Sequence, residues 1–544
     1  MYEMRLEHLR ADLHGPSAMA RDALSGRLAP DLVRVPLHLE DLAAPPQRFE
    51  EEDRLELATA LETHLAPLTP PVPVLDSLRQ LRRADALCVV TGQQPGLCAS
   101  PLYNLWKGMH AVRLARALAQ RLERPVVPLF WNHADDHDLA EVHHIHLLNK
   151  NLDIQKVGLA GMSSGRMPLS RVVFDEERHR LTALRAALEE SVHGSPHAAR
   201  ALDMCLPRAG ESFASAWTRT MVDLLGPHGL VVLEPDWLRT RFSRALAGLV
   251  AADCFEELVR GAQAVRARGY DAAIEPAEAA LVFRQDDKGR RALRVVAGEW
   301  RYDGEDGSRT SAELAAEIVQ EPLLWSPGAL LRPLVQDLAL PSIAYIGGHG
   351  ELGYHAQLGA IRAALDLPRT SFVPRLSCTV VEPAVRLALA KLGVATEEIL
   401  EARGTWQPQA EVHATPEVFS RLRQVARDGA RSLDGCREDL AELDKGLAVH
   451  LKRIGDQLKK SVEEIVIKAE RVQQNRSGKG RRHERRANNA LVPRGLPQER
   501  VFGPLALVAA HGVEWIGDLL GQIDPLPREH LVVHLGADLV EEGT

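Results

Sequence analysis

Residues 87–107 read LCVVTGQQPGLCASPLYNLWK, and this stretch decides the fold of the chain. It opens with a short apolar run, Leu87–Val90, which is typical of a strand buried on both faces. Glycine and proline then indicate a turn over 91–96, and beyond Pro101 the apolar residues recur at helical spacing. The stretch therefore predicts a strand, a polar loop and a helix whose first amides could hold a carboxylate or a phosphate.

The polar loop matches no established phosphate-binding motif. The GxxxxGK[ST] spacing of a Walker loop is absent, and so is GxGxxG. On pattern alone, a turn that only connects two elements explains these residues better than a binding loop does.

The composition is that of an ordinary soluble protein. The 544 residues are 45% hydrophobic and 26% charged, with a net charge of −8, which gives no sign of nucleic-acid binding. Six scattered cysteines without a CxxC pair favour a reducing compartment over a disulfide scaffold or a zinc cluster. Because neither a signal peptide nor a run of roughly 18 apolar residues is present, we expect a cytoplasmic protein without membrane contact.

Further apolar runs predict more strands of an α/β parallel sheet. They lie at 125–131, 229–234 and 342–346, and 330–334 also has strand character. Weaker patterns between them indicate inserts near 145–225 and 265–330. We expect a core over 1–385, a helical region over 386–490, and a helical segment over 491–544 that packs back on the core.

The helical region contains an eleven-residue apolar repeat over 437–475, as in the row Leu440, Leu451 and Val462. Eleven residues in three turns is close to the period of a free helix, so the helix should be nearly straight. Its predicted partner is Pro416–Arg431, and a turn at 432–435 would make the pair antiparallel.

A polar cluster follows the strand predicted at 125–131, where open α/β sheets place ligands. Its side chains could bind a metal ion, but their spacing matches no zinc signature, so we rank catalysis or substrate binding above metal binding. Some could instead cap a helix or lie in solvent. The cluster comprises Asp135, Asp136, His137, Asp138, Glu141, His143 and His144.

A second glycine-rich loop, GGHGELGYH over 347–355, follows the strand predicted at 342–346. Its amides could bind an anion and Glu351 could bind an amine, although a glycine turn before a helix explains it equally well. Because both loops and the polar cluster leave strand ends, we expect them to converge on one anion-binding cleft.

The chain resembles the BshC-type cysteine ligases of bacillithiol biosynthesis over nearly its whole length. The motifs that carry the resemblance are VTGQQPGL…SPLYNLWK, PLFWNHADDHDLAEVHH, PSIAYIGGHGELGYHAQL, FVPRLSCTVVE and LPQERV. The resemblance implies a Rossmann-like parallel-sheet core with inserted connective lobes and a long antiparallel α-helical coiled coil. It also implies that L-cysteine is added to the amine of glucosaminyl-malate, and that ATP or ADP binds near the coiled coil.

Three positions depart from the family pattern. Cys98-Ala99-Ser100 stands where a larger apolar residue and then small residues ending in glycine are usual, His349 replaces a usual proline, and Asp135 stands where Glu is common. The first two departures touch the expected pocket and so bear on substrate identity.

Amide formation from a free carboxylate is uphill in water, so a ligase needs an activated carboxyl, anion-binding groups and a base. We expect no metal, and the coiled coil allows a homodimer. The alternatives are a metal-dependent hydrolase that uses 135–144 and a non-catalytic nucleotide-binding scaffold. The expected catalytic residues are Asp136, His137 and Asp138; the substrate-binding residues are Thr91, Gly92, Gln93, Gln94, Tyr103, Lys107, Gly347, Gly348, Gly350, Glu351, Tyr354 and Arg375; the nucleotide-binding residues are Arg481, Arg485 and Asn489.

Overall fold

The computed structural model describes residues 3–43, 49–162, 166–286, 289–303, 307–407, 417–474 and 480–537. The chain divides into two compact units, one of residues 1–383 with 489–544 and one of residues 384–488. In the described part of the chain, no helix combines the length and the apolar character needed to span a bilayer.

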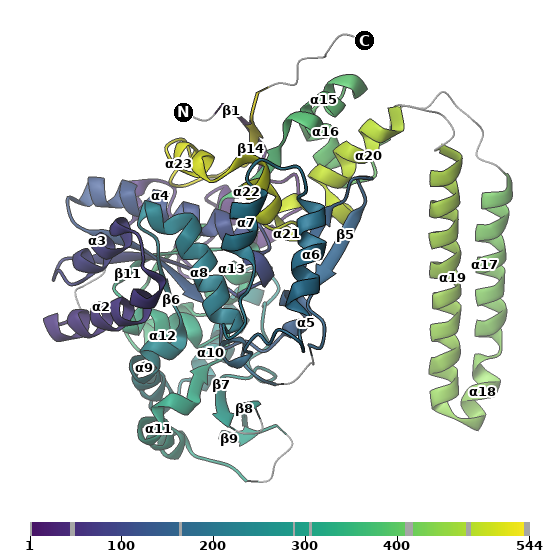
Figure 1. Ribbon diagram of the computed structural model, residues 1–544. Helices are drawn as coiled ribbons and strands as arrows, with labels where there is room; N and C mark the ends of the chain where they lie inside the picture. The colour runs from purple at the N-terminus through teal and green to yellow at the C-terminus, as the bar shows by residue number, and fades with distance from the viewer. Residues whose placement is uncertain are drawn as a thin grey trace. The chain divides into compact units, whose positions relative to one another are not determined.

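The first unit is built on a five-stranded parallel sheet in the order β12-β11-β2-β3-β6 (Figure 1). Along the chain these strands come fifth, fourth, first, second and third, so the order reverses between β2 and β11. That is the strand order of a Rossmann-like sheet, which confirms the predicted fold class, and the reversal is where such sheets bind ligands. The strands are β2 (Leu87–Gln93), β3 (Val126–Asn132), β6 (Val231–Leu233), β11 (Ser342–Gly347) and β12 (Ser371–Pro374).

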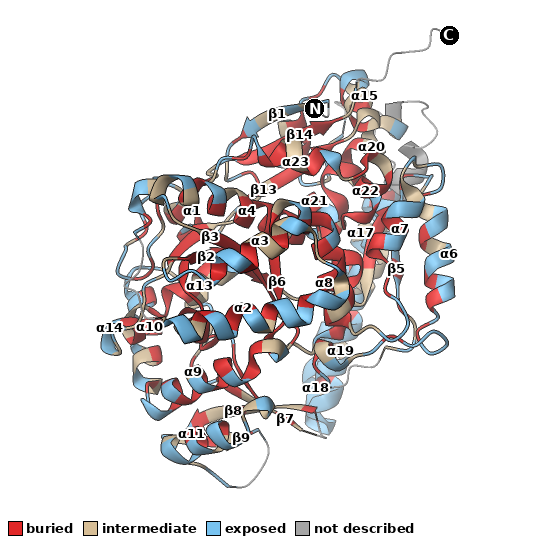
Figure 2. Ribbon diagram, turned by 60° about the vertical axis from the view of Figure 1, so that its left-hand side comes forward, coloured by how far each residue is buried: buried red, intermediate tan, exposed pale blue. Residues whose placement is uncertain are grey.

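The sheet is buried on both faces. Every residue of β3 and β11 is buried, and so is every residue of β2 except Gln93 (Figure 2). Helix α4 (Tyr103–Leu122) packs on β2 and β3, and α3 (Val72–Leu81) packs on β3 and β6. This cover explains why the strands are continuous apolar runs rather than alternating patterns.

The strand predicted at 330–334 is wrong, because α12 (Arg332–Ala339) begins there. Pro333 lies in the first turn of this helix, where its fixed φ is favourable and its missing N–H is not needed. The apolar run at 330–335 is thus the start of a buried helix, which periodicity cannot distinguish from a short buried strand.

The inserts carry their own small sheets. The first contains the antiparallel hairpin of β4 (His144–Leu148) and β5 (Ile154–Gly158), followed by α6 (Leu181–Ser191), α7 (Ala198–Cys205) and α8 (Phe213–Leu225). The second contains β7 (Val282–Asp286), β8 (Gly289–Val296), β9 (Glu299–Tyr302) and β10 (Trp325–Pro327) in the order β10-β7-β8-β9.

The C-terminal segment contains α21 (Gln498–Val501), α22 (Leu505–His511) and α23 (Glu514–Leu520). It ends in β14 (His530–Leu535), a strand that the sequence analysis did not predict. β14 lies between β1 (Met4–Leu9) and β13 (Ser377–Val381), so it joins the chain's two ends in one sheet.

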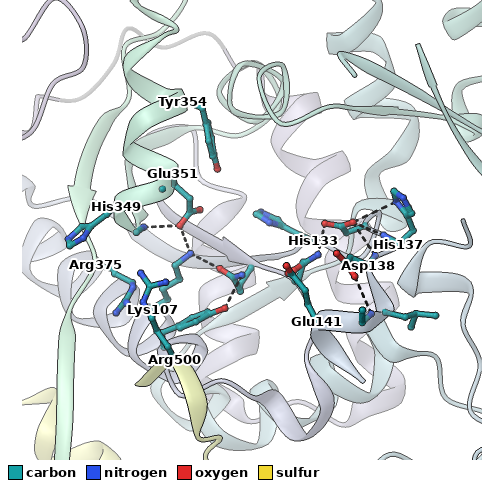
Figure 3. A pocket seen from close by; sticks show the side chains of 18 residues that line it. Lys107, His133, His137, Asp138, Glu141, His349, Glu351, Tyr354, Arg375 and Arg500 are labelled. Atoms are coloured by element: carbon teal, nitrogen blue, oxygen red, sulfur yellow. Dashed lines mark hydrogen bonds and ion pairs between the residues drawn. The ribbon is translucent and has the colours of Figure 1, made fainter. Parts of the chain in front are cut away.

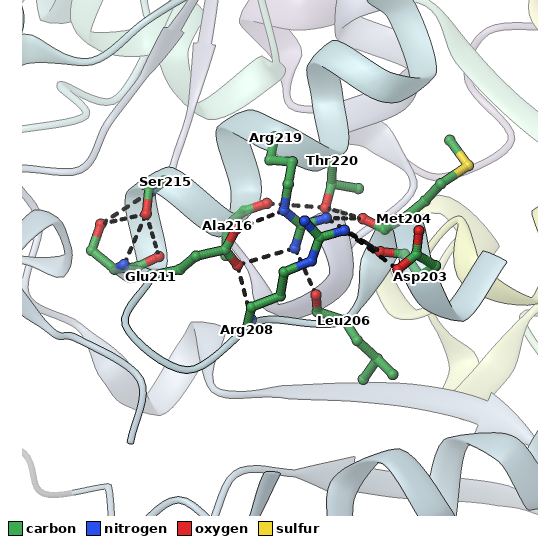
Figure 4. Close-up of polar contacts among 10 residues, drawn as sticks. Asp203, Met204, Leu206, Arg208, Glu211, Ser215, Ala216, Arg219 and Thr220 are labelled. Carbon is green, nitrogen blue, oxygen red and sulfur yellow. Dashed lines mark hydrogen bonds and ion pairs between the residues drawn. The ribbon is translucent and has the colours of Figure 1, made fainter. Parts of the chain in front are cut away.

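A buried arginine, Arg219, fixes the junction of α7 and α8 (Figure 4). Its guanidinium donates to both carboxylate oxygens of Glu211, at 2.7 and 3.1 Å, and to the carbonyls of Met204 and Leu206. Helix α8 in turn holds the end of β3, because the Asn132 side-chain amide donates to Thr218 Oγ1 at 3.1 Å. The insert therefore supports the strand end from which the polar cluster departs.

The second unit contains α15 (Pro383–Leu392) for most of its length, α16 (Thr396–Glu401) and the helices of the coiled coil. Helices α17 (Glu417–Gly435) and α19 (Lys445–Gln474) pack side by side (Figure 1). Arg423 pairs with Glu463, while Gly429 lies against Leu458, so residue numbers run in opposite directions. The antiparallel pair is confirmed for the described residues, which begin after Pro416.

The predicted turn of the coiled coil is wrong in position. Residues 432–435 are the end of α17, and the short helix α18 (Arg437–Leu443) follows before α19. The expected continuous helix over 437–475 is broken at Asp444, whose carboxylate accepts hydrogen bonds from the backbone N–H groups of Gly446 and Leu447. An aspartate in this position caps a new helix, and this capping overrides the apolar period.

Candidate functional site

A cavity of about 710 Å³ opens at the carboxyl ends of β2, β3, β11 and β12 (Figure 3). The loops after these strands supply its walls, as expected for a ligand site at the switch point of a parallel sheet. The predicted convergence of the two glycine loops and the polar cluster on one cleft is thus confirmed. The lining residues are Gln93, Gln94, Tyr103, Lys107, His133, Asp136, His137, Asp138, Leu139, Ala140, Glu141, Gly348, His349, Gly350, Glu351, Tyr354, Arg375 and Arg500.

Lys107 joins the first loop to the second across the switch point. Its Nζ donates to Glu351 Oε2 at 2.5 Å, to Gly92 O at 2.7 Å and to Gln93 Oε1 at 3.0 Å. The lysine side chain is 2% exposed and the glutamate 16% exposed. Lys107 therefore uses its three N–H donors inside the protein and holds the floor of the cavity in place.

Glu351 is held as a carboxylate. Burial would raise its pKa, but the charge of Lys107 and hydrogen bonds from Gly348 N, Lys107 and the Tyr345 hydroxyl outweigh burial, so the pKa of Glu351 lies below its usual value. The bond to Gly348 N closes the first turn of α13 (His349–Ala356). The second glycine loop is thus anchored by its own glutamate.

The polar cluster forms the opposite wall. Gln94 Nε2 donates to Asp136 Oδ2 at 2.5 Å, and Asp136 Oδ1 accepts from the backbone N–H of His137 at 2.6 Å. Asp138 caps the short helix α5 (Leu139–Val142) through Ala140 N. An ionised carboxylate has about four acceptor positions, so Asp136 retains capacity for a ligand.

The charges of the cavity are separated (Figure 3). Lys107, which is paired with Glu351, lies with Arg375 and Arg500 on one side, and Asp138 and Glu141 lie on the other. Burial, followed by the charges of Asp138 and Asp136, raises the pKa of Glu141, which is the effect expected where carboxylates gather without a cation. A ligand with an amine at one end and acid groups at the other would match this pattern.

The two arginines of the cationic side differ in their partners. Arg375 donates to Glu499 Oε1 at 2.6 Å, and both side chains are buried. Arg500 is exposed, and its side chain forms no hydrogen bond or ion pair with any described residue. The predicted carboxylate clamp, Arg375, already holds a carboxylate of the protein, whereas the guanidinium of Arg500 is available to a ligand.

Two histidines in the cavity are neutral at physiological pH. Burial, with the charges of Arg332 and Lys107, lowers the pKa of His133 well below its usual value. Burial, with the charges of Arg375 and Arg500, lowers the pKa of His349 to about 4. Neutral imidazoles can accept a proton or a hydrogen bond, so both add acceptors to a cavity whose other neutral groups are amides and tyrosines.

Three predicted substrate residues lie beside the cavity without lining it. Thr91 Oγ1 donates to Ile346 O at 2.8 Å and so ties β2 to β11. A Cβ on Gly92 would lie 2.3 Å from His133 Nε2, and one on Gly347 would lie 2.5 Å from the Phe372 ring, so both positions need glycine for close packing. The remaining predicted substrate and catalytic residues line the cavity, and their individual roles stay predictions.

The predicted nucleotide residues lie on α20 (Gly480–Leu491) and are not among the residues that line the cavity. Arg481 and Arg485 are one helical turn apart in the second unit, and Asn489, in the first unit, donates to Leu152 O at 2.7 Å. Arg481 and Arg485 belong to a basic run, RSGKGRRHERR over 476–486, of which residues 476–479 lie outside the described residues. Nucleotide binding at these positions stays a prediction.

The polar cluster does not gather around a common point as a metal site would. Asp135 pairs with Arg239, and the rings of His143 and His144 meet edge to face and do not line the cavity. Within the described ranges, no three His, Cys, Asp or Glu side chains are placed to hold a metal ion.

Sequence reasoning missed three polar residues of the cavity. Arg500 lies in the LPQERV motif, which was recognised without being given a role, and it reaches the cavity from a distant part of the chain. His133 precedes the polar cluster, and its proximity to Gly92 gave no sequence signal. His349 was noted only as a departure from the family pattern.

Comparisons with known proteins cover almost the whole chain. Residues 38–376 match the family model described as "Bacillithiol biosynthesis BshC, N-terminal Rossmann-like domain", and residues 378–535 match "Bacillithiol biosynthesis BshC, C-terminal coiled-coil domain". A protein of Koribacter versatilis named "Putative cysteine ligase BshC" is 29% identical over 496 residues, which are 90% of this chain and 91% of the relative. Relatives with the same printed name in Shouchella clausii (28% identical, 89% of this chain, 90% of the relative) and Heliobacterium modesticaldum (29%, 82% and 82%) are also similar. The chain belongs to the bacillithiol biosynthesis BshC family.

Proposed function

We propose that this chain is a cysteine ligase that joins the carboxyl group of L-cysteine to the amine of glucosaminyl-malate, giving bacillithiol. Family membership supports the reaction class, and the separated charges of the 710 Å³ cavity support the substrate. Glucosaminyl-malate carries an ammonium group on its sugar and carboxylates on its malate. It would lie with the ammonium toward Asp136 and Asp138 and the carboxylates toward Arg500.

The single observation that carries this proposal is the position of Arg500 opposite Asp138 and Glu141 in one cavity (Figure 3). Within the described part of the chain, the Arg500 side chain pairs with no carboxylate, and it faces Asp138 and Glu141, which pair with no cation. A hydrolase of simple esters or amides would need no such arrangement, whereas an acceptor that is both amine and acid satisfies both walls at once.

The chemistry requires an activated carboxyl, and we propose ATP as its source. Cysteine and ATP would form an acyl-adenylate with loss of pyrophosphate. The acceptor ammonium then loses a proton to Asp136, directly or through water, and the amine attacks the acyl carbon while AMP leaves with the bonding electrons. The backbone amides of His349 and Gly350, at the start of α13, would stabilise the oxyanion of the tetrahedral intermediate.

The proposal also includes the cellular compartment in which the reaction takes place. A product with a free thiol persists in a reducing compartment, and the six cysteines are all unpaired, with five of them buried. We therefore place the enzyme in the cytoplasm. A homodimer through the coiled coil stays a prediction.

The test is to incubate the purified protein with L-cysteine and glucosaminyl-malate, and to detect the thiol product by mass spectrometry. One series contains ATP, and a second contains a cysteine thioester in place of cysteine and ATP. Product in both series supports the full proposal, and product from the thioester alone supports the ligase but rejects ATP as the donor. No enzyme-dependent product in either series would reject the ligase and favour the nucleotide-binding scaffold.

A further inference from the structure

A second cavity of about 380 Å³ adjoins the first. The two share His133, Asp136, His137 and Tyr354, so a molecule in one would meet a molecule in the other at these side chains. The second cavity extends toward β7 and the start of α12, where its walls are mostly apolar. These apolar walls include Ile274, Ala280, Phe283, Pro327 and Leu330.

Two arginines in this cavity have no carboxylate partner among the residues that the structure describes. Arg332, which is 9% exposed, contacts only neutral groups: Tyr354 OH at 3.1 Å, Gln336 Oε1 at 3.3 Å and Tyr345 OH at 3.4 Å. The guanidinium of Arg290 lies 3.7 Å from the centre of the Phe283 ring. Among the described residues, neither arginine forms an ion pair.

A neighbouring arginine shows the contrast. Arg239 is equally buried, but it is neutralised by Asp135 and Asp236. Unpaired buried charge is costly, and proteins retain it where a ligand supplies the counter-ion. Arg290 Nε is also buried without a hydrogen-bond partner, and so is His133 Nε2. Three polar side chains of this cavity, Arg332, Arg290 and His133, therefore have capacity to bind a ligand.

We propose that this second cavity binds the amino acid that donates the carboxyl group, with its carboxylate against Arg332 and Arg290. Its ammonium would face Asp136 at the junction, and its short side chain would lie among the apolar residues near Ala280 and Phe283. Carboxylate binders, an acidic group and an apolar wall in one cavity match a zwitterion with a small apolar side chain. The identity of this amino acid as cysteine rests on the proposed function.

This placement gives the residues that line both cavities a role in bringing the two substrates together. The amino-acid carboxyl would lie next to His133 and Tyr354, and the acceptor amine would lie in the first cavity beside Asp136. The two reacting groups would then meet where the cavities join, which is the positioning that turns a bimolecular step into an intramolecular one.

The test is calorimetric titration of the full-length protein with L-cysteine, in the absence of acceptor and nucleotide, for Arg290→Met and Arg332→Met. Arg284→Met is the matched control. Arg284 lies on β7 of the same small sheet, where it stacks over Trp325 and pairs with Glu321, but it lines neither cavity. Ala280→Leu, which fills the apolar end, provides a variant that leaves both arginines in place.

We expect Arg290→Met, Arg332→Met and Ala280→Leu to weaken cysteine binding by about tenfold or more, with Arg284→Met unchanged. Glucosaminyl-malate binding should be retained in Arg290→Met and Ala280→Leu. The inference is overturned if wild-type protein binds no small amino acid, if Arg290→Met binds cysteine as wild type does, or if inorganic phosphate or ATP, rather than cysteine, loses affinity in that variant.

The same titrations separate this inference from the proposed function. If alanine or serine binds with the same dependence on Arg290 and no thiol product forms, the amino-acid site stands and the cysteine ligase falls. If the thiol product forms while Arg290→Met and Arg332→Met bind cysteine as tightly as wild type does, the ligase function is supported. The second cavity is then not the amino-acid site.

Discussion

Lys107 Nζ and Glu351 Oε2 lie 2.5 Å apart across the point where the strand order of the sheet reverses. One residue follows β2 and the other follows β11, and the sequence separates them by 244 positions. Both lie at the floor of the cavity, so this ion pair fixes the distance between its two glycine loops. The acceptor site depends on that distance, because each loop carries groups that the ligand must reach.

Breaking this pair should destabilise the core and abolish binding. Lys107→Met or Glu351→Gln removes one member of a buried ion pair, which typically costs about 3–5 kcal/mol in the free energy of unfolding. The double variant should lose less than the sum of the two single losses, because the orphaned charge is gone. Urea unfolding of the four proteins measures this cycle, and additive losses would show that the two residues act independently.

His349 should make the core sensitive to mild acid. Its folded pKa of about 4 lies below its ordinary value of 6.5, so the unfolded chain binds the proton more tightly. Stability is therefore present above pH 6.5 and is lost as the pH falls toward 4, by roughly 3 kcal/mol for this group. His349→Gln should lose correspondingly less stability over the same range of pH. If urea unfolding showed the same loss of stability with falling pH in wild type and in His349→Gln, the lowered pKa of His349 would be contradicted.

Arg375 and Arg500 should behave differently when they are removed. Arg375→Ala leaves Glu499 buried and unpaired, so we expect a loss of about 3–5 kcal/mol in the free energy of unfolding. Arg500→Ala should leave stability unchanged within about 0.5 kcal/mol and raise KM for glucosaminyl-malate. Urea unfolding measures the stability of both variants, and steady-state kinetics on the same preparations measure KM. A stable Arg375→Ala with normal KM would overturn the pairing argument.

Asp136 should act on the rate rather than on the fold. Asp136→Asn keeps one oxygen to accept from His137 N, and its NH2 group can donate to the Gln94 amide oxygen after that amide flips. The substitution removes the charge and the basicity, so kcat/KM should fall by about 10²–10⁴-fold with the unfolding midpoint unchanged. His143→Gln is the control, because His143 bonds Leu139 O and does not line the cavity. Equal activity of the two variants would remove Asp136 from the mechanism.

Much of the core could be predicted because its signals are local. The apolar run Leu87–Val90 and the turn after it specify a strand, a loop and a helix in one short stretch, and such strand ends meet at one edge of a parallel sheet. The strand predicted at 330–334 failed because a short apolar run looks the same in a helix and in a strand. The coiled coil broke at Asp444 because a single capping side chain outweighed the period around it.

The site was only partly predictable because several of its contacts are non-local. Lys107 has the sequence context of a phosphate contact, and only the fold shows that Glu351, Gly92 and Gln93 occupy its three donors. Arg500 reaches the cavity from the far end of the chain. The second cavity is formed by residues from β7, α12 and the polar cluster, which no short motif connects.

The central claim is that one cavity, with cations on one side and carboxylates on the other, holds the amine acceptor. Calorimetric titration of wild-type protein, Arg500→Ala and Asp136→Asn with glucosaminyl-malate tests it without any energy donor. The account predicts one molecule bound per chain and affinity about tenfold or more weaker in each variant. Equal affinity in all three proteins, or no binding by the wild type, would contradict it.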